Sequence, residues 1–277
     1  MAPKRELLLS LYQAAVEAAH PSAWLASHLP ALPRTGRLIV IAAGKAGAAM
    51  GSVVEGHYGN LGQLDRVLGV VTAPYGYAAT LGHAAPRHLA VVEGRHPTPD
   101  QGSLAAAETA LRLAASATAD DIVVVLLSGG ASSLWAAPAA GLSLDEKTAL
   151  TRGLLKSGAD IHEMNTVRRH LSRIKGGRLA KAARAAPMLT LAVSDVPGDD
   201  PATIGSGPTV PDPTTLAEAQ AIVTRRAPGM AALGLPVPDT VLSALADPAN
   251  ETPKPGDPAF AKSSYRIVAT PAGSLDA

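Results

Sequence analysis

The chain has 277 residues, of which 47% are hydrophobic and 17% charged, and its formal net charge is +1. A chain of this length can bury a large core in one large or two modest domains, and no apolar run approaches the length of a membrane span. The lack of cysteine excludes disulfides, thiolate metal sites and a cysteine nucleophile, and it agrees with a cytoplasmic enzyme. Balanced charge, and a basic stretch without interleaved aromatic residues, argue against a nucleic-acid partner.

The first candidate site follows a predicted strand at residues 37–42, after two predicted helices that end near His20 and Leu29. The strand leads into a glycine turn that contains Gly44 and Lys45, and then into a helix of small residues. A strand, a glycine turn and a helix in this order place anions at a helix N-terminus, here with a lysine beside it.

Two more strands are predicted at residues 67–72 and 88–92, and a proline-rich loop follows at 94–100. Its prolines limit the backbone before Asp100 or Ser103 caps an alanine-rich helix. His96 and Asp100 are the acid/base candidates in this constrained loop.

Residues 122–127 are six consecutive apolar residues, which predict a strand buried on both faces of a parallel sheet. A turn of small residues follows, so backbone N–H groups can converge on an anion at the carboxyl edge of the sheet. The same residues also fit a tight glycine turn without a ligand. The candidates in this turn are Ser128, Gly129, Gly130, Ser132 and Ser133.

Residues 152–184 hold nine Lys and Arg residues against one Asp and one Glu. Most such runs are solvated helix faces. The angular positions of these Lys and Arg residues on the predicted helix nevertheless distinguish them from one another. Arg168 and Lys175 fall on the border of an apolar stripe, while Arg169 and Arg173 point away from it. A cation at that border needs a partner or a wet cleft, so Asn165, Arg168 and Lys175 are better site candidates than their neighbours.

A further buried strand is predicted at residues 188–193, and carboxylates follow it directly. Hard oxygen ligands so grouped suit Mg²⁺, with Asp195 and Asp199 as the candidates. An ordinary Asp/Pro/Gly turn explains the same residues equally well. A second small-residue loop lies close by in sequence, at Gly205, Ser206 and Gly207.

Helices are predicted at residues 215–226 and 239–245, and a strand and a turn at 265–274. We therefore expect one domain at residues 1–246, a proline-rich linker at 247–264, and the start of a second domain at 265–277. A strand that enters a turn normally continues into a crossover, so the sequence predicts that most of this second domain is missing.

Five motifs stand in one order along the chain: AAGKAG (42–47), GRHPTPD (94–100), LSGGASSL (127–134), HEMNTVRRHLSRIKGGRL (162–179) and SDVPGDD (194–200). Together they make the chain resemble the amino-terminal part of the glycerate 2-kinase family of the MOFRL type, whose members are often labelled hydroxypyruvate reductase. The resemblance implies a Rossmann-like domain facing a smaller second domain. It also implies an ATP- and Mg²⁺-dependent kinase that converts D-glycerate to 2-phosphoglycerate, and it is compatible with a homodimer.

Phosphoryl transfer requires positioned cations and N–H donors around the γ-phosphate, and the candidates supply both. Lys45 and Asp195 are the predicted catalytic residues, and Asp195 with Asp199 would hold Mg²⁺. Phosphate binding is predicted at Gly44, Ser128, Gly129, Gly130, Ser132, Ser133, Gly205, Ser206 and Gly207. Substrate binding is predicted at His96, Asp100, Asn165, Arg168 and Lys175. The general base stays open between His96, Asp100 and Asp195.

Two other classes of function stay open. A nicotinamide-dependent reductase would favour G-x-G-x-x-G with an acidic residue about 20 positions on. The turn at residues 43–47 lacks this glycine spacing, although Asp65 lies at about that distance. A non-catalytic binder of a phosphorylated metabolite is the second alternative.

Overall fold

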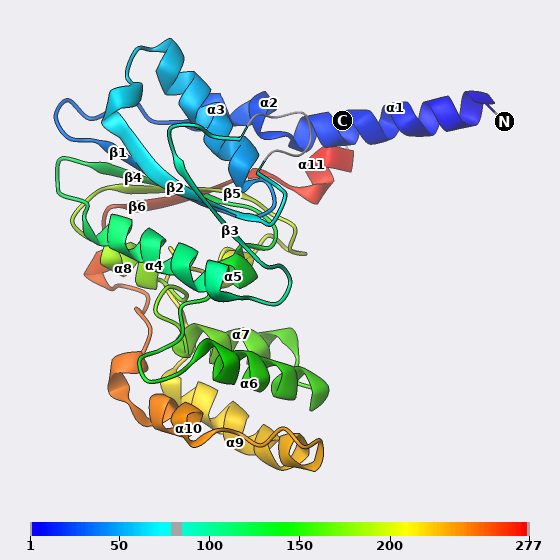
Figure 1. Cartoon of the computed structure of the whole chain (residues 1–277), viewed down its shortest axis with the longest axis vertical. Coiled ribbons are helices and arrows are strands. Elements are labelled where there is room, and N and C mark those ends of the chain that lie inside the picture. Colours follow the sequence, from blue (N-terminus) through cyan, green and yellow to red (C-terminus); the bar gives the residue numbers. More distant parts are fainter. Residues whose placement is uncertain (1, 79–84, 276–277) are drawn as a thin grey trace.

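The computed structural model of the chain describes residues 2–78 and 85–275, and its centre is a six-stranded sheet (Figure 1). All neighbouring strands run parallel, in the order β3-β2-β1-β4-β5-β6. Ligands of such doubly wound sheets bind where the strand order reverses, which here is between β1 and β4. The predicted Rossmann-like, mostly parallel α/β fold is confirmed. The strands are β1 (Leu38–Ala43), β2 (Val67–Pro74), β3 (Ala90–Gly94), β4 (Ile122–Leu127), β5 (Met188–Val193) and β6 (Ser263–Ala269).

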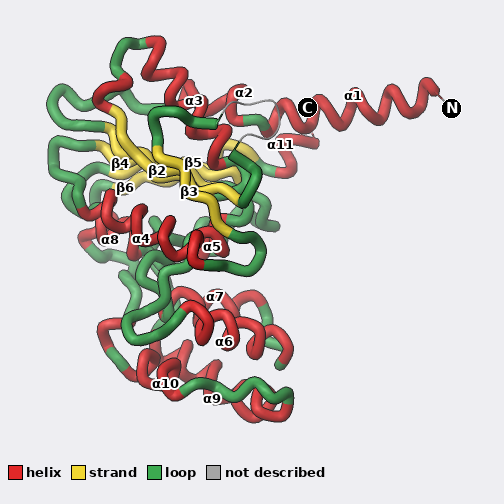
Figure 2. The backbone as a smooth tube through the Cα atoms, viewed as in Figure 1, coloured by secondary structure: helices red, strands yellow, loops and turns green. Residues whose placement is uncertain are grey.

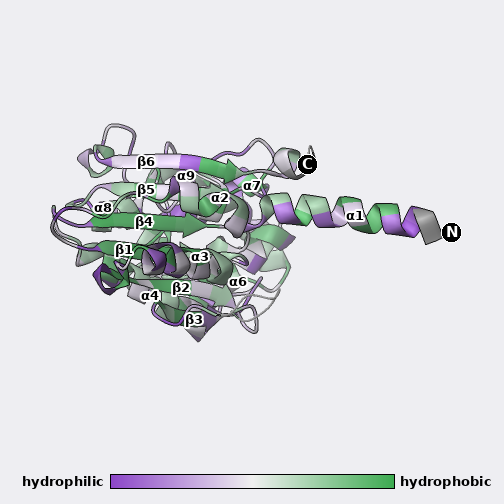
Figure 3. Ribbon diagram, turned by 90° about the horizontal axis from the view of Figure 1, so that it is seen from above, coloured by the Kyte–Doolittle hydropathy of each residue, from purple (hydrophilic) through white to green (hydrophobic). Residues whose placement is uncertain are grey.

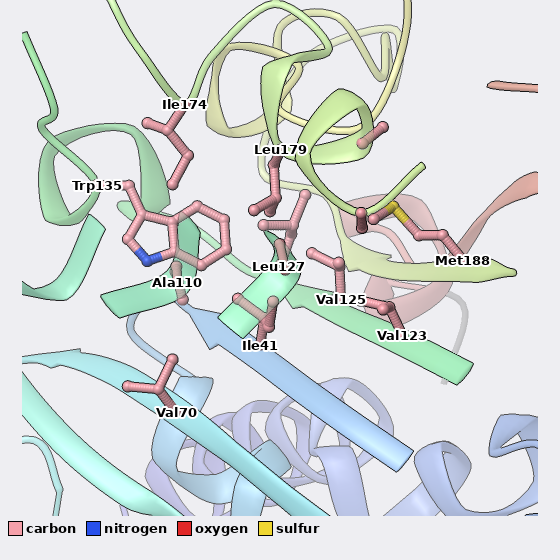
Figure 4. Close-up of a cluster of buried hydrophobic side chains, with 14 of the residues drawn as sticks. Ile41, Val70, Ala110, Val123, Val125, Leu127, Trp135, Ile174, Leu179 and Met188 are labelled. Carbon is pink, nitrogen blue, oxygen red and sulfur yellow. The ribbon is translucent and has the colours of Figure 1, made fainter. Parts of the chain in front are cut away.

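The central strands are buried on both faces, as their continuous apolar sequences predict. One face of the sheet is covered by α2 (Pro21–His28) and α3 (Gly47–Asn60). The other is covered by α4 (Gln101–Ala115), α5 (Ala131–Leu134) and α8 (Arg178–Ala182). On this second face Trp135 and Ile174 belong to the same buried cluster as Ile41 and Val125 of the sheet (Figure 4).

A separate group of helices lies below the sheet (Figures 1 and 2). It consists of α6 (Leu144–Lys156), α7 (Ile161–His170), α9 (Leu216–Ala232) and α10 (Asp239–Ala246), which share a buried apolar cluster of their own. Capping boxes start three of these helices, and the one predicted for α6 at Ser143 and Glu146 is confirmed. This group brings α6 and α7 under the carboxyl ends of the strands.

The amino-terminal helix α1 (Ala2–Ala19) projects from the body of the molecule, with α11 (Pro271–Leu275) beside its base (Figures 1 and 3). Several large apolar side chains of α1 are exposed, among them Leu8 and Tyr12. Within residues 2–78 and 85–275, none of the helices combines the length and apolar character that crossing a membrane requires. Short 3₁₀ turns are η1 (Leu64–Arg66), η2 (Ile204–Ser206), η3 (Pro248–Asn250) and η4 (Pro258–Phe260).

The structure corrects two helix predictions. Helix α9 continues past Arg226 to Ala232, with Pro228 inside it. Helix α7 ends at His170, because Leu171 has non-helical backbone angles (φ −91°, ψ 35°). Lys175 therefore lies on the loop after α7, and the helical angle used to choose it does not apply.

The carboxyl-terminal strand β6 pairs with β5 along its length and forms the edge of the sheet in the described part of the chain. The segment before it, predicted as a linker, carries four buried residues, which are Asn250, Thr252, Pro253 and Ala259. The domain boundaries at residues 246 and 264 stay a prediction.

Candidate active site at the strand carboxyl ends

The turns after β1 and β4 are hydrogen-bonded to each other at the point where the strand order reverses. The amide of Lys45 donates to the carbonyl oxygen of Gly129 (2.8 Å), and the amide of Ala46 donates to Oγ of Ser128 (3.0 Å). Gly44 has φ +131°, and a Cβ at this position would overlap Oγ of Ser128. Glycine is therefore required for the two turns to approach this closely.

Lys45, His96 and Asp195 come together around this turn. A Cβ at Gly129 would overlap Oδ2 of Asp195, and one at Gly130 would lie 2.8 Å from Cδ2 of the His96 ring. Burial lowers the pKa of His96 below its ordinary value, the positive charge of Lys45 lowers it further, and Asp195 opposes the shift. Three residues that follow three different strands thus lie within electrostatic reach of one another.

The charged groups of this cluster are accessible to a ligand. Lys45 and Asp195 are exposed, and neither forms an ion pair with another described residue. Asp199 is half-buried at φ +52°. No set of three or more His, Asp or Glu side chains that could hold a metal ion is found in the part of the chain that the structure describes. Two carboxylates still fit Mg²⁺, which commonly takes one or two protein carboxylates together with substrate phosphates and water.

A second cluster is centred on Ser132. Nη2 of Arg168 donates to its Oγ (2.5 Å), and Nζ of Lys175 donates to its carbonyl oxygen (2.6 Å). Oγ of Ser206 also shares a hydrogen bond with Oγ of Ser132 (2.8 Å). The structure thus brings Ser132, Ser206, Arg168 and Lys175 together, as expected for members of one site. Asn165 is buried on α7, and no described residue hydrogen-bonds its side chain.

A cavity of about 330 Å³ opens beside this second cluster. Its walls come from the loop after β3, from α5, α6 and α7, and from the loop that carries Lys175. The lining residues are Pro97, Thr98, Pro99, Ser132, Ser133, Ala136, Lys147, Thr148, Thr151, Arg152, Leu155, Arg168 and Lys175.

Helix α6 also lines the cavity, through Lys147 among others, although neither was predicted as part of the site. Lys147 is buried and donates from Nζ to the carbonyl oxygen of Leu171 (2.6 Å). A signal was present, because Lys147 occupies a position of the apolar stripe that also contains Leu144, Leu150 and Leu154. A lysine at such a position is unusual enough to mark a functional candidate.

Several predicted site residues already have partners within the protein. Asp100 caps α4, where its Oδ1 accepts from the amides of Ser103 and Arg95 (both 3.1 Å). Burial raises the pKa of Asp100, but these hydrogen bonds outweigh it and hold the pKa below its ordinary value. The hydroxyl of Ser133 donates to the carbonyl oxygen of Gly130 (3.0 Å).

The backbone of the loop at residues 205–207 also has hydrogen-bond partners within the protein. The amides of Ser206 and Gly207 donate to the carbonyl oxygens of Thr203 and Ile204. The carbonyl oxygens of Ser206 and Gly207 in turn accept from the two glycine amides at 176 and 177. The hydrogen bonds of this loop therefore support the segment that carries Lys175.

Arg169 corrects a further prediction. Its sequence position suggested an orientation away from the apolar stripe, yet the side chain is buried, with Nε 3.2 Å from Oδ1 of Asp212. The angular position of Arg169 on its helix could not reveal this partner, because Asp212 is 43 residues away in sequence.

Comparisons with known proteins agree on one family. Residues 7–243 match the family described as "Domain of unknown function (DUF4147)". An Agrobacterium vitis protein provisionally named hydroxypyruvate reductase is 43% identical over 273 residues, which are 99% of this chain and 58% of that protein. The glycerate 2-kinase of Pyrococcus horikoshii is 43% identical over 188 residues, which are 68% of this chain and 40% of that protein.

A solved structure gives the same result. The crystal structure of a glycerate kinase from Thermotoga maritima has a TM-score of 0.82 and 30% sequence identity, and the match covers 100% of this chain and 61% of that one. The chain therefore spans less than two thirds of the length of each of these relatives. The family match over most of the chain, with glycerate kinases among its relatives in sequence and in structure, confirms the resemblance, and the chain belongs to the DUF4147 family.

Proposed function

We propose that this chain carries the catalytic centre of a glycerate 2-kinase, which transfers the γ-phosphoryl group of ATP to the 2-hydroxyl of D-glycerate. The observation that carries the proposal is the meeting of Lys45, His96 and Asp195 at the switch point of the sheet. Relatives named glycerate 2-kinase support the substrate assignment.

The nucleotide is placed at the turns after β1 and β4. Lys45 stabilises the transferring phosphoryl group as a point charge, since its side chain is exposed and unpaired among the described residues. The amides of Gly129 and Gly130 donate to no described residue and can bind phosphate oxygens. Asp195 and Asp199 would hold a Mg²⁺ ion, which neutralises phosphate charge when bound.

The acceptor is placed beside Ser132, where Arg168, Lys175 and Asn165 are expected to bind its carboxylate. His96 is the better candidate for contact with the reacting hydroxyl, because burial and Lys45 favour its neutral form, which can accept a proton. Asp100 is less suited to that role, since it is hydrogen-bonded as a helix cap.

A nicotinamide-dependent reductase is the second candidate, favoured by the strand order, which is also that of dinucleotide-binding domains. The turn at residues 43–47 weakens it, because the three-glycine spacing is absent there. A non-catalytic binder of a phosphorylated metabolite is the third. A cytoplasmic location and a homodimer stay predictions.

Calorimetric titration of the 277-residue chain distinguishes these candidates. We expect ATP to bind more tightly with Mg²⁺ than without it, and NADH to bind more weakly than ATP. Lys45→Ala should weaken ATP binding, whereas Lys181→Ala, which removes an exposed lysine of α8, should not. Equal affinity for ATP with and without Mg²⁺ would contradict the proposed role of the metal. Tighter binding of NADH than of ATP would favour the reductase.

A further inference from the structure

Three buried or half-buried cations line the cavity beside α6 without a carboxylate partner. Lys147, Arg168 and Lys175 line it together with the exposed Arg152, and no Asp or Glu is among its lining residues. The partners of the first three are neutral oxygen atoms of Leu171 and Ser132. Within the described ranges, none of these cations forms an ion pair.

Neighbouring cations from the same basic stretch do have carboxylate partners. Nε of Arg169 lies 3.2 Å from Asp212, and Nε2 of His170 lies 3.0 Å from Glu251. The fold therefore supplies carboxylates to these neighbouring cations but none to the lining of the cavity. Because a buried cation without an anion is costly, the cavity is suited to an anion that comes from outside the chain.

The cations in the cavity also repel one another. Burial, reinforced by the charges of Arg168, Arg178 and Arg173, lowers the pKa of Lys147 to about 7. Burial, with Arg168 and Lys147 adding to it, lowers the pKa of Lys175 well below its ordinary value. A bound anion would relieve this repulsion and favour the protonated form of both lysines.

Position and size restrict what the cavity can hold. Pro97 follows His96, and Ser132 lies two residues after Gly130, so the cavity adjoins the cluster of Lys45, His96 and Asp195. Its volume of about 330 Å³ lies at the lower end for ligand pockets, which fits a small acid rather than a whole nucleotide. Thr148 and Thr151 add hydroxyl groups to the wall formed by α6.

We propose that Lys147 is a substrate-binding residue which, with Arg168 and Lys175, holds the carboxylate of a small hydroxy acid in this cavity and takes up a proton from solvent as the acid binds. The identity of the acid, D-glycerate, rests on the proposed function. Helix α6 thus takes part in acceptor binding, which is coupled to protonation of Lys147. The charged groups around Lys147 are Arg168, Arg173, Lys175 and Arg178, and the pKa of Lys175 is itself lowered by burial and by the charges of Arg168 and Lys147.

Calorimetry with D-glycerate tests the proposal in buffers of different ionisation enthalpy at about pH 8. For the unmodified chain, the observed heat should change with the buffer, because a proton is taken up on binding. Lys147→Met, which keeps side-chain length without charge, should weaken glycerate binding about tenfold or more and reduce the proton uptake. The matched control is Lys156→Met, at an exposed lysine on the same helix, and it should change neither.

A second measurement requires no variant. The affinity of the unmodified chain for glycerate should fall as the pH rises from about 7 to about 9, because free Lys147, with a pKa of about 7, must then take up a proton to bind the acid. Affinity that is independent of pH, or Lys147→Met binding glycerate like the unmodified chain, would overturn the proposal. So would inorganic phosphate binding in the cavity while glycerate does not. ATP titrations on the same samples separate this outcome from a failure of the kinase proposal, since ATP binding should be unaffected by Lys147→Met.

Discussion

The side chain of Lys45 is exposed, and its backbone amide donates to the carbonyl oxygen of Gly129. A substitution that removes the side chain should therefore leave the turn intact. Because negative charge is redistributed over the transferring group in the transition state, Lys45→Ala should lower the rate of phosphoryl transfer on the order of 10²-fold or more. The KM for glycerate should change much less. Stopped-time assays of ADP release, with Lys181→Ala as the control, measure both. A variant that keeps kcat and only raises the KM for glycerate would show that Lys45 does not act on the phosphoryl group.

Asp121 joins the beginnings of β1 and β4. Its carboxylate accepts from the amide of Arg37 (2.8 Å), from the Arg37 guanidinium (3.0 Å) and from the amide of Thr118 (2.9 Å). The hydrogen bond from the Arg37 side chain is the largest influence on the pKa of Asp121 and holds it well below its ordinary value, although burial opposes this. These bonds stabilise the charged form of a buried side chain at the base of the two strands that carry the site.

We expect Asp121→Asn to lower the free energy of unfolding by about 2 kcal/mol, because hydrogen bonds to a charged acceptor are replaced by weaker ones. Since the folded-state pKa is depressed, the stabilisation is fully present above the unfolded value of about 4 and is lost as the pH falls below it. Urea unfolding at about pH 7 and pH 3 measures this. The variant should lose less stability on acidification than the unmodified chain, and an equal loss would show that Asp121 does not contribute.

At the residue scale, site residues were predicted most accurately where they directly follow a strand. Lys45 and Asp195 were identified because parallel strands bring their carboxyl ends to one edge, and the structure places both there. Lys147 was not identified, because it shares its cavity with Ser132 and Lys175, which are distant from it in sequence. Lys175 was selected for its expected position on a helix, but α7 ends at His170. Lys175 contacts Ser132 from the following loop instead.

At the element scale, the strands were predicted to within two residues of their observed ends, because long apolar runs bounded by glycine and proline are a strong local signal. The end of α7 and the continuation of α9 were not predicted. In the first case the loop is fixed by distant hydrogen bonds, such as that from the amide of Gly177 to the carbonyl oxygen of Gly207. In the second, the continued helix buries Met230 in the core of the helical group despite Pro228.

Strand β6 differs from the central strands in how it is held. It pairs only with β5 among the described residues, and each of its residues is half-buried or exposed, whereas β4 is almost wholly buried between two strands. Amide hydrogen exchange should therefore be faster along β6 than along β4. Exchange followed by mass spectrometry on the 277-residue chain tests this, and equal protection in the two strands would contradict it.

At the scale of the whole molecule, the candidate site lies between two layers. One layer is the sheet and the other is the helical group below it (Figure 1). The loops at the carboxyl edge of the sheet carry Lys45, His96 and Asp195, and the helical group carries Lys147 and Arg168. Lys45 and Asp195 remain exposed to solvent in the described structure. Because phosphoryl transfer benefits from exclusion of water, we expect transfer by this chain to be well below the usual range for kinases of roughly 1–100 s⁻¹.

The most direct test of the proposed kinase function is to follow the phosphoryl group itself. The 277-residue chain at high concentration is incubated with ATP, Mg²⁺ and D-glycerate, and phosphorus NMR records the products over time. We predict that 2-phosphoglycerate and ADP appear together, slowly, and that Lys45→Ala abolishes both while Lys181→Ala does not. Absence of any phosphoglycerate, formation of the 3-phosphate, or NADH-dependent reduction of hydroxypyruvate by the same sample would contradict it.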